Sequence, residues 1–223
     1  MNKCVKPLSE LFENCLNEHY IDVANAASYA LEKEDGKLFI YFEWSNGKED
    51  WKNNLDFPCK PYKEMGNNWY CHRGFLRVWQ SVKPYIKAEV KNSKYNCINI
   101  VGYSHGAALA VLAHEYVWFN RPDLRNNGLY GYGFGCPRVF WGVCDNCAKD
   151  RWKNFTVIRN GNDLVTFLPP KLLGYRHVGN ILKIGESVNP IKDHTPDRYK
   201  IALGFHRSKN IINKVGKALQ IKP

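Results

Sequence analysis

The sequence predicts an α/β protein in which a mainly parallel sheet is covered by helices on both faces. Two observations lead to this prediction. Short apolar runs suited to buried strands alternate with longer segments of helical periodicity, and 44% of the 223 residues are hydrophobic, which is enough for a full core. No internal repeat and no linker divides the chain. We therefore expect a single domain over residues 1–223.

The first 36 residues are expected to form a helical segment. Apolar residues from Leu8 to Leu16 recur with a period of about 3.6, which indicates an amphipathic helix, and residues 23–31 are rich in alanine. An Asp35-Gly36 turn then leads into an apolar strand over residues 37–42. The polar residues 43–70 are expected to be loop, with at most one short helix.

The rest of the chain alternates between the two kinds of element. One helical face repeats over residues 76–90, where Pro84 should kink the helix or lie near its start. Further helices are expected over residues 107–119 and 197–203. The remaining strands are expected at residues 97–101, 129–134, 155–158 and 181–184.

A candidate nucleophile lies between a predicted strand and a predicted helix. The segment Gly102–Gly106 fits the pattern G-x-S-x-G, with Ser104 at its centre. In this setting the serine occupies a sharp turn, and a side chain at either flanking position would collide with neighbouring backbone. The helix that follows directs N–H groups and its positive dipole end at the site. The pattern therefore predicts a nucleophilic serine.

A serine hydroxyl reacts only when a base accepts its proton, and the base needs an orienting carboxylate. In α/β-hydrolases the three residues follow in the order Ser, Asp or Glu, His. Asp163 lies on the loop directly after the predicted strand 155–158, which is the expected place for the acid. Asp145 and Asp150 rank behind it, because neither can be placed at a strand end.

The base is chosen among the histidines that follow the nucleophile and its helix, which are His177, His194 and His206. His194 lies in a loop just before a predicted helix, where an imidazole can reach over the edge of the sheet. His177 follows Asp163 closely and stays the alternative. We expect His194 to be the base, with geometry deciding.

With these residues placed, the sequence resembles the class 3 (fungal-type) lipases, a family of α/β-hydrolases, from about residue 38 to residue 203. The resemblance implies the α/β-hydrolase fold. In the family the histidine after Gly-Tyr is not catalytic and a later one before a helix is, which supports His194. The segments that carry the resemblance are Phe42–Ser45 with Trp51 and Asn54–Phe57, His72–Phe75, Gly133–Val139, and Asn162–Val165 with Leu168–Pro170 and Gly174–His177.

The resemblance also implies an oxyanion hole formed by Ser45 and the backbone N–H of His105. Two departures from the family accompany it. Glu43-Trp44 precede Ser45 where the family usually has Arg-Gly, and the segment equivalent to the lid, residues 46–53, is short and polar. A lid without an apolar face favours a lipid-ester or small-ester hydrolase over one activated at insoluble triglyceride.

The net charge of +11 is concentrated towards the C-terminus. Residues 207–223 are basic, contain no acidic residue and show an apolar stripe if helical. Such a helix can lie on an anionic membrane or dock on the protein body with its lysines in solvent. We prefer docking, and we expect no nucleic-acid partner because no fold signature for one is present.

Eight cysteines and the absence of a visible export signal predict reduced thiols in a cytoplasmic protein. The pair Cys144 and Cys147 lacks the second close Cys or His pair that structural zinc requires, so we expect no metal.

These observations predict a serine esterase or lipase that acts on a lipid or small ester and needs no cofactor. Ser104 would attack, His194 would transfer the proton and Asp163 would orient the imidazole. A phospholipase drawn to anionic membranes keeps the same chemistry and stays an alternative. A catalytically idle binding module with this fold is the alternative from another class.

Overall fold

The computed structural model describes residues 4–44, 58–62, 69–142 and 149–204. Within these residues the central sheet has seven strands in the order β1-β2-β3-β6-β7-β9-β11. The last five are parallel to one another, and the first two pair antiparallel at one edge. The strand bounds are β1 (Ile21–Val23), β2 (Ala27–Glu34), β3 (Lys37–Phe42), β6 (Cys97–Tyr103), β7 (Leu129–Phe134), β9 (Phe155–Asn160) and β11 (Asn180–Ile184).

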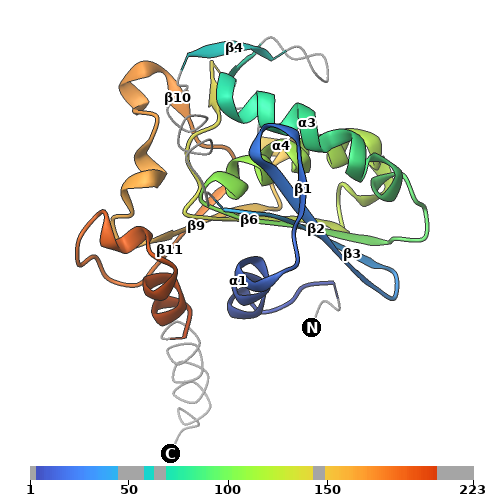
Figure 1. The fold of residues 1–223 in the computed structure, drawn as a ribbon, viewed down its shortest axis with the longest axis horizontal. Helices are drawn as coiled ribbons and strands as arrows, with labels where there is room; N and C mark the ends of the chain where they lie inside the picture. The colour runs from blue at the N-terminus through green and yellow to red at the C-terminus, as the bar shows by residue number, and fades with distance from the viewer. Residues whose placement is uncertain (1–3, 45–57, 63–68, 143–148, 205–223) are drawn as a thin grey trace, which may run out of the picture.

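Helices cover both faces of this sheet, as predicted. In Figure 1, α3 (Arg73–Val90) and α4 (His105–Asn120) lie above the sheet, and α1 (Leu8–Asn17) lies below it with the helix 196–204. Alternate residues of β3 therefore enter different cores: Leu38, Ile40 and Phe42 pack on the side of α3 and α4, whereas Phe39 and Tyr41 pack on the side of α1.

A second, antiparallel sheet of four strands lies above the central one in the described structure, in the order β10-β8-β5-β4. Residues 43–70 were expected to be loop, but the described part of this segment contains two strands. In β5 the side chains alternate, with Trp69 and Cys71 buried and Tyr70 exposed. The strand bounds are β4 (Cys59–Tyr62), β5 (Trp69–His72), β8 (Phe140–Trp141) and β10 (Tyr175–Arg176).

The predicted N-terminal helical segment 1–36 is wrong except for α1. After β1, a single turn of 3-10 helix, η1 (Ala24–Ala26), leads into β2, which forms a hairpin with β3. Gly36 turns this hairpin with a φ of 66°. Alanine favours a helix more than any other residue, but this propensity is a weak determinant of structure, and the hydrogen bonds between β2 and β3 decide the structure instead.

The remaining predicted elements are present with small shifts of their ends. The strand at 129–134 has the predicted bounds, and Pro84 lies inside α3. No helix among the described residues is both long and apolar enough to cross a membrane. The basic segment 207–223, Cys144 and Cys147 lie outside the described residues.

Candidate active site

Ser104 lies on a sharp turn between β6 and α4, in an unusual backbone conformation with φ 54° and ψ −117°. The two flanking glycines make this turn possible. A Cβ on Gly102 would lie 2.2 Å from the carbonyl oxygen of Gly106, and a Cβ on Gly106 would lie 2.3 Å from the carbonyl oxygen of Phe42. Both distances are far below van der Waals contact, so the backbone packs too closely for any other residue.

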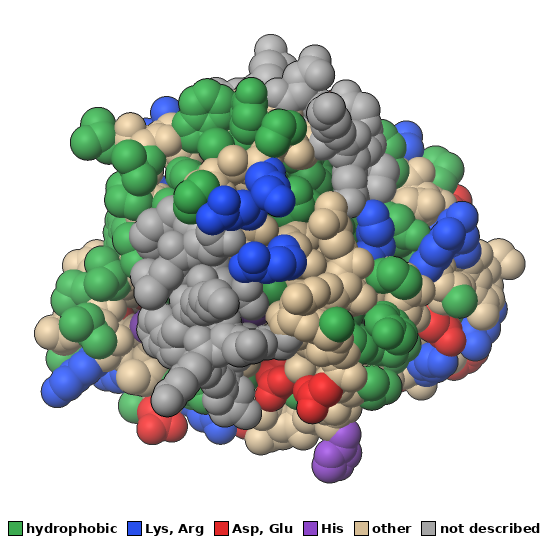
Figure 2. Space-filling view, turned by 45° about the horizontal axis from the view of Figure 1, so that its top comes forward, with side chains coloured by type: hydrophobic (Ala, Val, Ile, Leu, Met, Phe, Trp, Pro, Cys, Tyr) green, Lys and Arg blue, Asp and Glu red, His purple; other side chains and the backbone are tan. Residues whose placement is uncertain are grey.

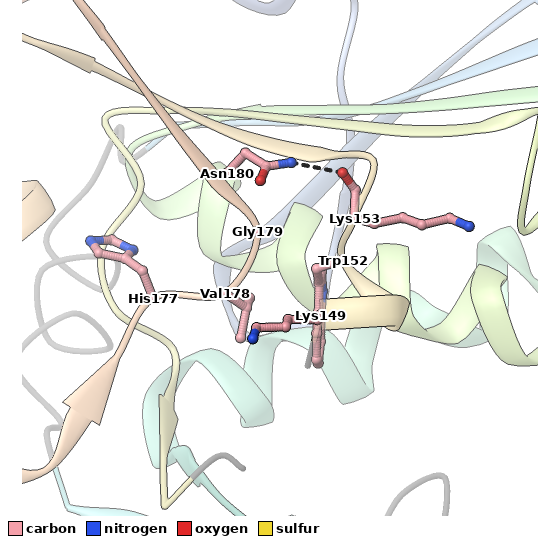
Figure 3. Close-up of a pocket in the computed structure, with 7 residues that line it drawn as sticks. All are labelled: Lys149, Trp152, Lys153, His177, Val178, Gly179 and Asn180. Carbon is pink, nitrogen blue, oxygen red and sulfur yellow. Dashed lines mark hydrogen bonds between the residues drawn. The ribbon is translucent and has the colours of Figure 1, made fainter. Parts of the chain in front are cut away.

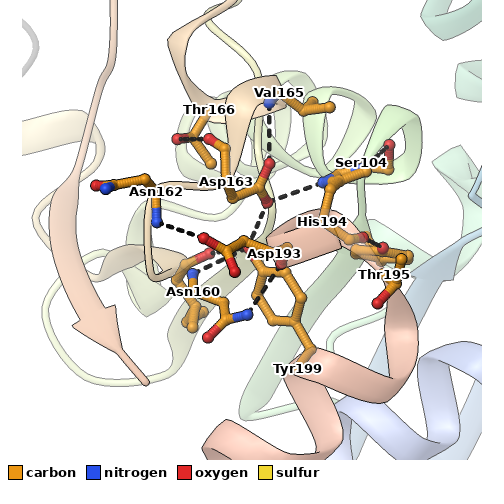
Figure 4. A network of polar contacts seen from close by, with 12 residues as sticks. Ser104, Asn160, Asn162, Asp163, Val165, Thr166, Asp193, His194, Thr195 and Tyr199 are labelled. Atoms are coloured by element: carbon orange, nitrogen blue, oxygen red, sulfur yellow. Dashed lines mark hydrogen bonds and ion pairs between the residues drawn. The ribbon is translucent and has the colours of Figure 1, made fainter. Parts of the chain in front are cut away.

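The structure brings the three predicted residues together into one hydrogen-bonded line, shown in Figure 4. His194 Nε2 lies 2.8 Å from Ser104 Oγ, and its Nδ1 lies 2.8 Å from Asp163 Oδ2. Asp163 directly precedes η4 (Leu164–Phe167), and His194 ends η6 (Lys192–His194). This arrangement allows the imidazole to accept the serine proton while the carboxylate stabilises the resulting imidazolium.

The alternatives considered for acid and base lie elsewhere. His177 Nε2 is 2.7 Å from the carbonyl oxygen of Thr166, and burial lowers the pKa of His177 to about 4 despite that contact. Asp150 is exposed, and Asp145 and His206 lie outside the described residues.

The carboxylate of Asp163 is fully buried and accepts several hydrogen bonds. Its Oδ1 accepts one from the backbone N–H of Val165 at 2.9 Å, and its Oδ2 accepts one from Tyr199 Oη at 2.7 Å in addition to the contact with His194. Burial, and then the negative charge of Asp163, raise the pKa of Tyr199 well above its ordinary value, so the phenol stays a donor. Such partners fix the carboxylate in the orientation that the imidazole needs.

The backbone around His194 is held from two sides. The ring of Tyr103 lies against the imidazole with centroids 5.2 Å apart, and its hydroxyl donates to the carbonyl oxygen of His194. The neighbouring carboxylate of Asp193 is buried and accepts hydrogen bonds from Ser187 Oγ at 2.7 Å and from the backbone N–H groups of Val188 and Asn162 at 3.0 and 3.1 Å. Burial alone would raise the pKa of Asp193, but these donors outweigh it and the pKa is lowered.

Gly135 packs directly against the acid and the base. Its φ is 56°, and a Cβ there would lie 2.9 Å from Asp163 Oδ2 and 2.9 Å from His194 Cε1. The residue follows β7, whose end meets the ends of β6 and β9 at the same edge of the parallel sheet. Only a glycine fits the backbone angle and leaves room for the His194–Asp163 pair.

Of the two residues predicted to form the oxyanion hole, the structure describes His105 but not Ser45. His105 is the first residue of α4, so its N–H belongs to the helix N-terminus, where backbone N–H groups lack partners within the helix. Its imidazole is buried and stacks edge-on against Phe75. Ser45 lies outside the described residues, and its role stays a prediction.

A separate cavity of about 460 Å³ lies beside β11 (Figure 3). None of the described residues that line it belongs to the line Ser104–His194–Asp163. No group of three or more His, Cys, Asp or Glu side chains suited to a metal ion occurs in the part of the chain that the structure describes. The lining residues of the cavity are Lys149, Trp152, Lys153, His177, Val178, Gly179 and Asn180.

A family model described as Lipase (class 3) matches residues 39–173, more than half of the chain. The chain belongs to the class 3 lipase family. Solved lipase structures share its fold, which confirms the predicted α/β-hydrolase fold. The structure of a fungal lipase–inhibitor complex matches with a TM-score of 0.65 at 22% identity, and the match covers 74% of this chain and 66% of the lipase chain. A triacylglycerol lipase described as having a serine protease triad has a TM-score of 0.62 at 21% identity, covering 76% and 67%.

Curated relatives in this lipase family come from fungi. "Secreted mono- and diacylglycerol lipase 1" of Fusarium solani is 34% identical over 164 residues, which cover 68% of this chain and 45% of the relative. "Secreted mono- and diacylglycerol lipase LIP2" of Malassezia restricta is 31% identical over 141 residues, covering 57% and 41%. The chain thus spans less than half the length of these relatives. Because both are named as secreted, the expected cytoplasmic location is wrong.

Three residues of the site around Ser104 were not predicted from the sequence: Tyr199, Tyr103 and Gly135. Tyr199 lies in the predicted helix after His194, and only the tertiary structure shows that it contacts Asp163. Tyr103 occupies a variable position of the G-x-S-x-G pattern. Gly135 belongs to the Gly-Cys-Pro-Arg segment of the resemblance, and that motif was the one signal that could have found it.

Proposed function

We propose that this class 3 lipase chain hydrolyses carboxylic esters of lipids through an acyl-enzyme formed on Ser104. The observation that carries the proposal is the continuous line of 2.8 Å contacts from Ser104 Oγ through His194 to Asp163 Oδ2. Family membership supports the same chemistry. Acyl transfer requires a nucleophile, a base within hydrogen-bond reach of it and a third group that orients the base.

In the first half of the reaction, Ser104 Oγ attacks the ester carbonyl while His194 Nε2 accepts the hydroxyl proton. The N–H of His105, together with Ser45, would stabilise the negative charge on the carbonyl oxygen. The imidazolium then gives its proton to the departing alcohol, which leaves an acyl group on Ser104. In the second half, water attacks the acyl carbon while His194 accepts its proton. The bond to Ser104 Oγ then breaks, the carboxylic acid leaves, and the imidazolium returns the proton to Ser104.

Mono- and diacylglycerols are the first substrates to test, because two of the relatives described above are named as mono- and diacylglycerol lipases. The polar segment 46–53 also favours these substrates, because it lacks the apolar face expected for activation at insoluble triglyceride.

The deciding experiment combines active-site labelling with a hydrolysis panel. A fluorophosphonate probe should label the wild type and fail to label Ser104→Ala. The same variant should lose turnover of mono-, di- and triacylglycerols and of a soluble short-chain ester by a factor on the order of 10⁵. Ser93→Ala changes an exposed serine and serves as the control that retains labelling. Folded wild-type protein that neither reacts with the probe nor hydrolyses any ester would make the chain a binding module instead.

A further inference from the structure

The two loops that carry the acid and the base expose large apolar side chains to solvent. Leu164 directly follows Asp163, and Ile191 precedes His194 by three residues. The loops touch, since the N–H of Leu164 donates to the carbonyl oxygen of Pro190. The most exposed side chain, Leu172, has 97% of its surface in water. We name these exposed side chains the apolar rim: Leu164, Phe167, Leu172, Leu173, Val188 and Ile191.

Three arginines lie beside this rim and form what we call the arginine cluster: Arg138, Arg159 and Arg176. The guanidinium groups of Arg159 and Arg138 lie 4.9 and 6.0 Å from the ring centroid of Phe167. Arg176 lies in β10, next to η5 (Lys171–Leu173), and donates to the carbonyl oxygen of Lys171 at 2.9 Å. Figure 2 shows a face of the molecule on which Lys and Arg side chains gather beside hydrophobic ones.

Among the residues that the structure describes, no carboxylate counter-charge pairs with the arginine cluster. No ion pair joins any of its members to a carboxylate in the described part of the chain, although six other basic residues there have such pairs. Burial, and then the charges of Arg176 and Arg159, lower the pKa of Arg138. The Nε of Arg159 is buried and has no hydrogen-bond partner within the described part of the chain. Mutual repulsion and an unused donor both favour an anion at this place.

Backbone contacts hold part of the cluster in place. Arg138 donates to the carbonyl oxygens of Phe167 and Pro169, the latter at 2.8 Å, so its charge is fixed against the loop that carries the rim. A preorganised array of guanidinium groups suits phosphate, which accepts hydrogen bonds from several donors at once. The adjoining leucines suit the hydrocarbon of a lipid layer, because their burial there removes apolar surface from water.

We propose that the arginine cluster and the apolar rim together bind the surface of an anionic phospholipid layer, with the phosphates on the arginines and the leucines in the acyl region. This inference rests on the proposed function, because Leu164 and Ile191 of the rim lie on the loops that carry Asp163 and His194, so binding there would bring the catalytic residues to the lipid. It assigns the anionic contact to the arginine cluster and the apolar rim rather than to the basic segment 207–223. Lipid composition then controls how much of the enzyme reaches its substrate.

Vesicle binding of the inactive Ser104→Ala protein tests this proposal without any turnover. We expect this protein to bind vesicles of phosphatidylcholine and phosphatidylglycerol in equal parts much more tightly than vesicles of phosphatidylcholine alone. Adding Arg159→Gln and Arg176→Gln should weaken binding to the anionic vesicles about 30-fold, since each cation near such a surface contributes about fivefold. Leu172→Ser should weaken binding to both kinds of vesicle by about tenfold.

Matched variants distinguish binding by the arginine cluster from an effect of the protein's net charge. Lys87→Gln with Lys91→Gln removes the same number of charges from two exposed residues at the C-terminal end of α3. It should weaken binding less than about threefold, because screening limits the effect of charges distant from the lipid. The proposal is overturned if this pair weakens binding as much as the arginine pair, or if only Lys214→Gln with Lys217→Gln in the C-terminal segment weakens it. Equal binding to neutral and anionic vesicles overturns it as well. Hydrolysis of a soluble ester by the wild type tests the proposed function separately.

Discussion

Tyr199 Oη lies 2.7 Å from Asp163 Oδ2, the same carboxylate oxygen that His194 Nδ1 contacts at 2.8 Å. Two donors therefore converge on one buried oxygen. Tyr199 comes from the helix 196–204, which begins directly after the loop that carries His194. The short stretch of chain that supplies the base thus also supplies a second donor to the acid, so the position of the helix and the geometry of the site are linked.

Tyr199→Phe removes this donor and keeps the ring. We expect kcat/KM to fall about fivefold to tenfold, because a hydrogen bond to a buried carboxylate is lost. The ring keeps its packing, so steady-state hydrolysis of a soluble ester and denaturant unfolding together report what the lost bond contributes to activity and to stability. Tyr85→Phe, at an exposed tyrosine, should change neither quantity.

Gly135→Ala should abolish most activity. The added Cβ would lie 2.9 Å from both Asp163 Oδ2 and His194 Cε1, so the His194–Asp163 pair has to separate. We expect kcat/KM to fall at least about 100-fold, since acid–base catalysis by the displaced imidazole contributes on this order. Steady-state hydrolysis of a soluble ester measures the loss.

Gly142→Ala is the matched control for this substitution. Gly142 also has a positive φ, 72°, but a Cβ there meets no atom of the described residues within 4 Å. It should therefore lose about 1 kcal/mol of stability through backbone strain and keep its activity. If both alanine variants lose activity equally, contact with the triad is not the reason that position 135 requires glycine.

The line Ser104–His194–Asp163 could be predicted because each member has a local signal. Ser104 has its glycine-flanked turn between strand and helix, and Asp163 follows a strand directly. The carboxyl ends of parallel strands meet at one edge of a sheet, so residues far apart along the chain converge there. His194 followed from its order in the chain and from the family resemblance.

The parts that could not be predicted depend on long-range pairing. The segment 23–31 is rich in alanine, but its second half belongs to β2, where hydrogen bonds to β3 make it a strand. Similarly, β8 and β10 contain two residues each and exist only through their pairing in the small sheet. Tyr199 carries no motif at all, because its contact with Asp163 arises from the angle at which the helix 196–204 packs on the sheet.

Asp193→Asn should reduce activity by loosening the loop of His194. The two oxygens of Asp193 accept hydrogen bonds from Ser187, Val188 and Asn162, among others. In the asparagine variant an NH₂ group replaces one of these oxygens, so a donor would face the donors that this oxygen now binds. We expect the free energy of unfolding to fall by about 1–3 kcal/mol and kcat to fall with it. Asp197→Asn removes the same charge from an exposed carboxylate nearby and should have little effect. Denaturant unfolding and steady-state kinetics report the two quantities.

The pKa of Asp193 gives this variant a second signature. Because the folded-state pKa lies below the unfolded value, the ionised carboxylate stabilises the fold above the unfolded pKa, and this stability is lost as the pH falls through the folded pKa. The wild type and Asp193→Asn should therefore converge in stability at acid pH. A stability difference that stays constant down to the most acid pH at which the wild type folds would contradict this origin.

His114 should make the fold sensitive to mild acid. Its imidazole is fully buried against Phe155, and neither ring nitrogen has a hydrogen-bond partner among the described residues. Burial lowers the pKa of His114 to about 3. The unfolded chain therefore binds a proton below its ordinary pKa of about 6.5 while the folded chain does not, so stability falls as the pH falls. Between pH 7 and pH 5 we expect the free energy of unfolding to decrease by about 2 kcal/mol from this residue.

His114→Leu should remove that part of the pH dependence. His177, whose pKa is also lowered, acts in the same direction, so the slope should decrease without disappearing. His19→Asn changes an exposed histidine and should leave the slope as it is in the wild type. Denaturant unfolding at a series of pH values gives the measurement. If the leucine variant has the slope of the wild type, the buried imidazole is not what makes the protein acid-sensitive, and other groups titrating in this range carry the effect.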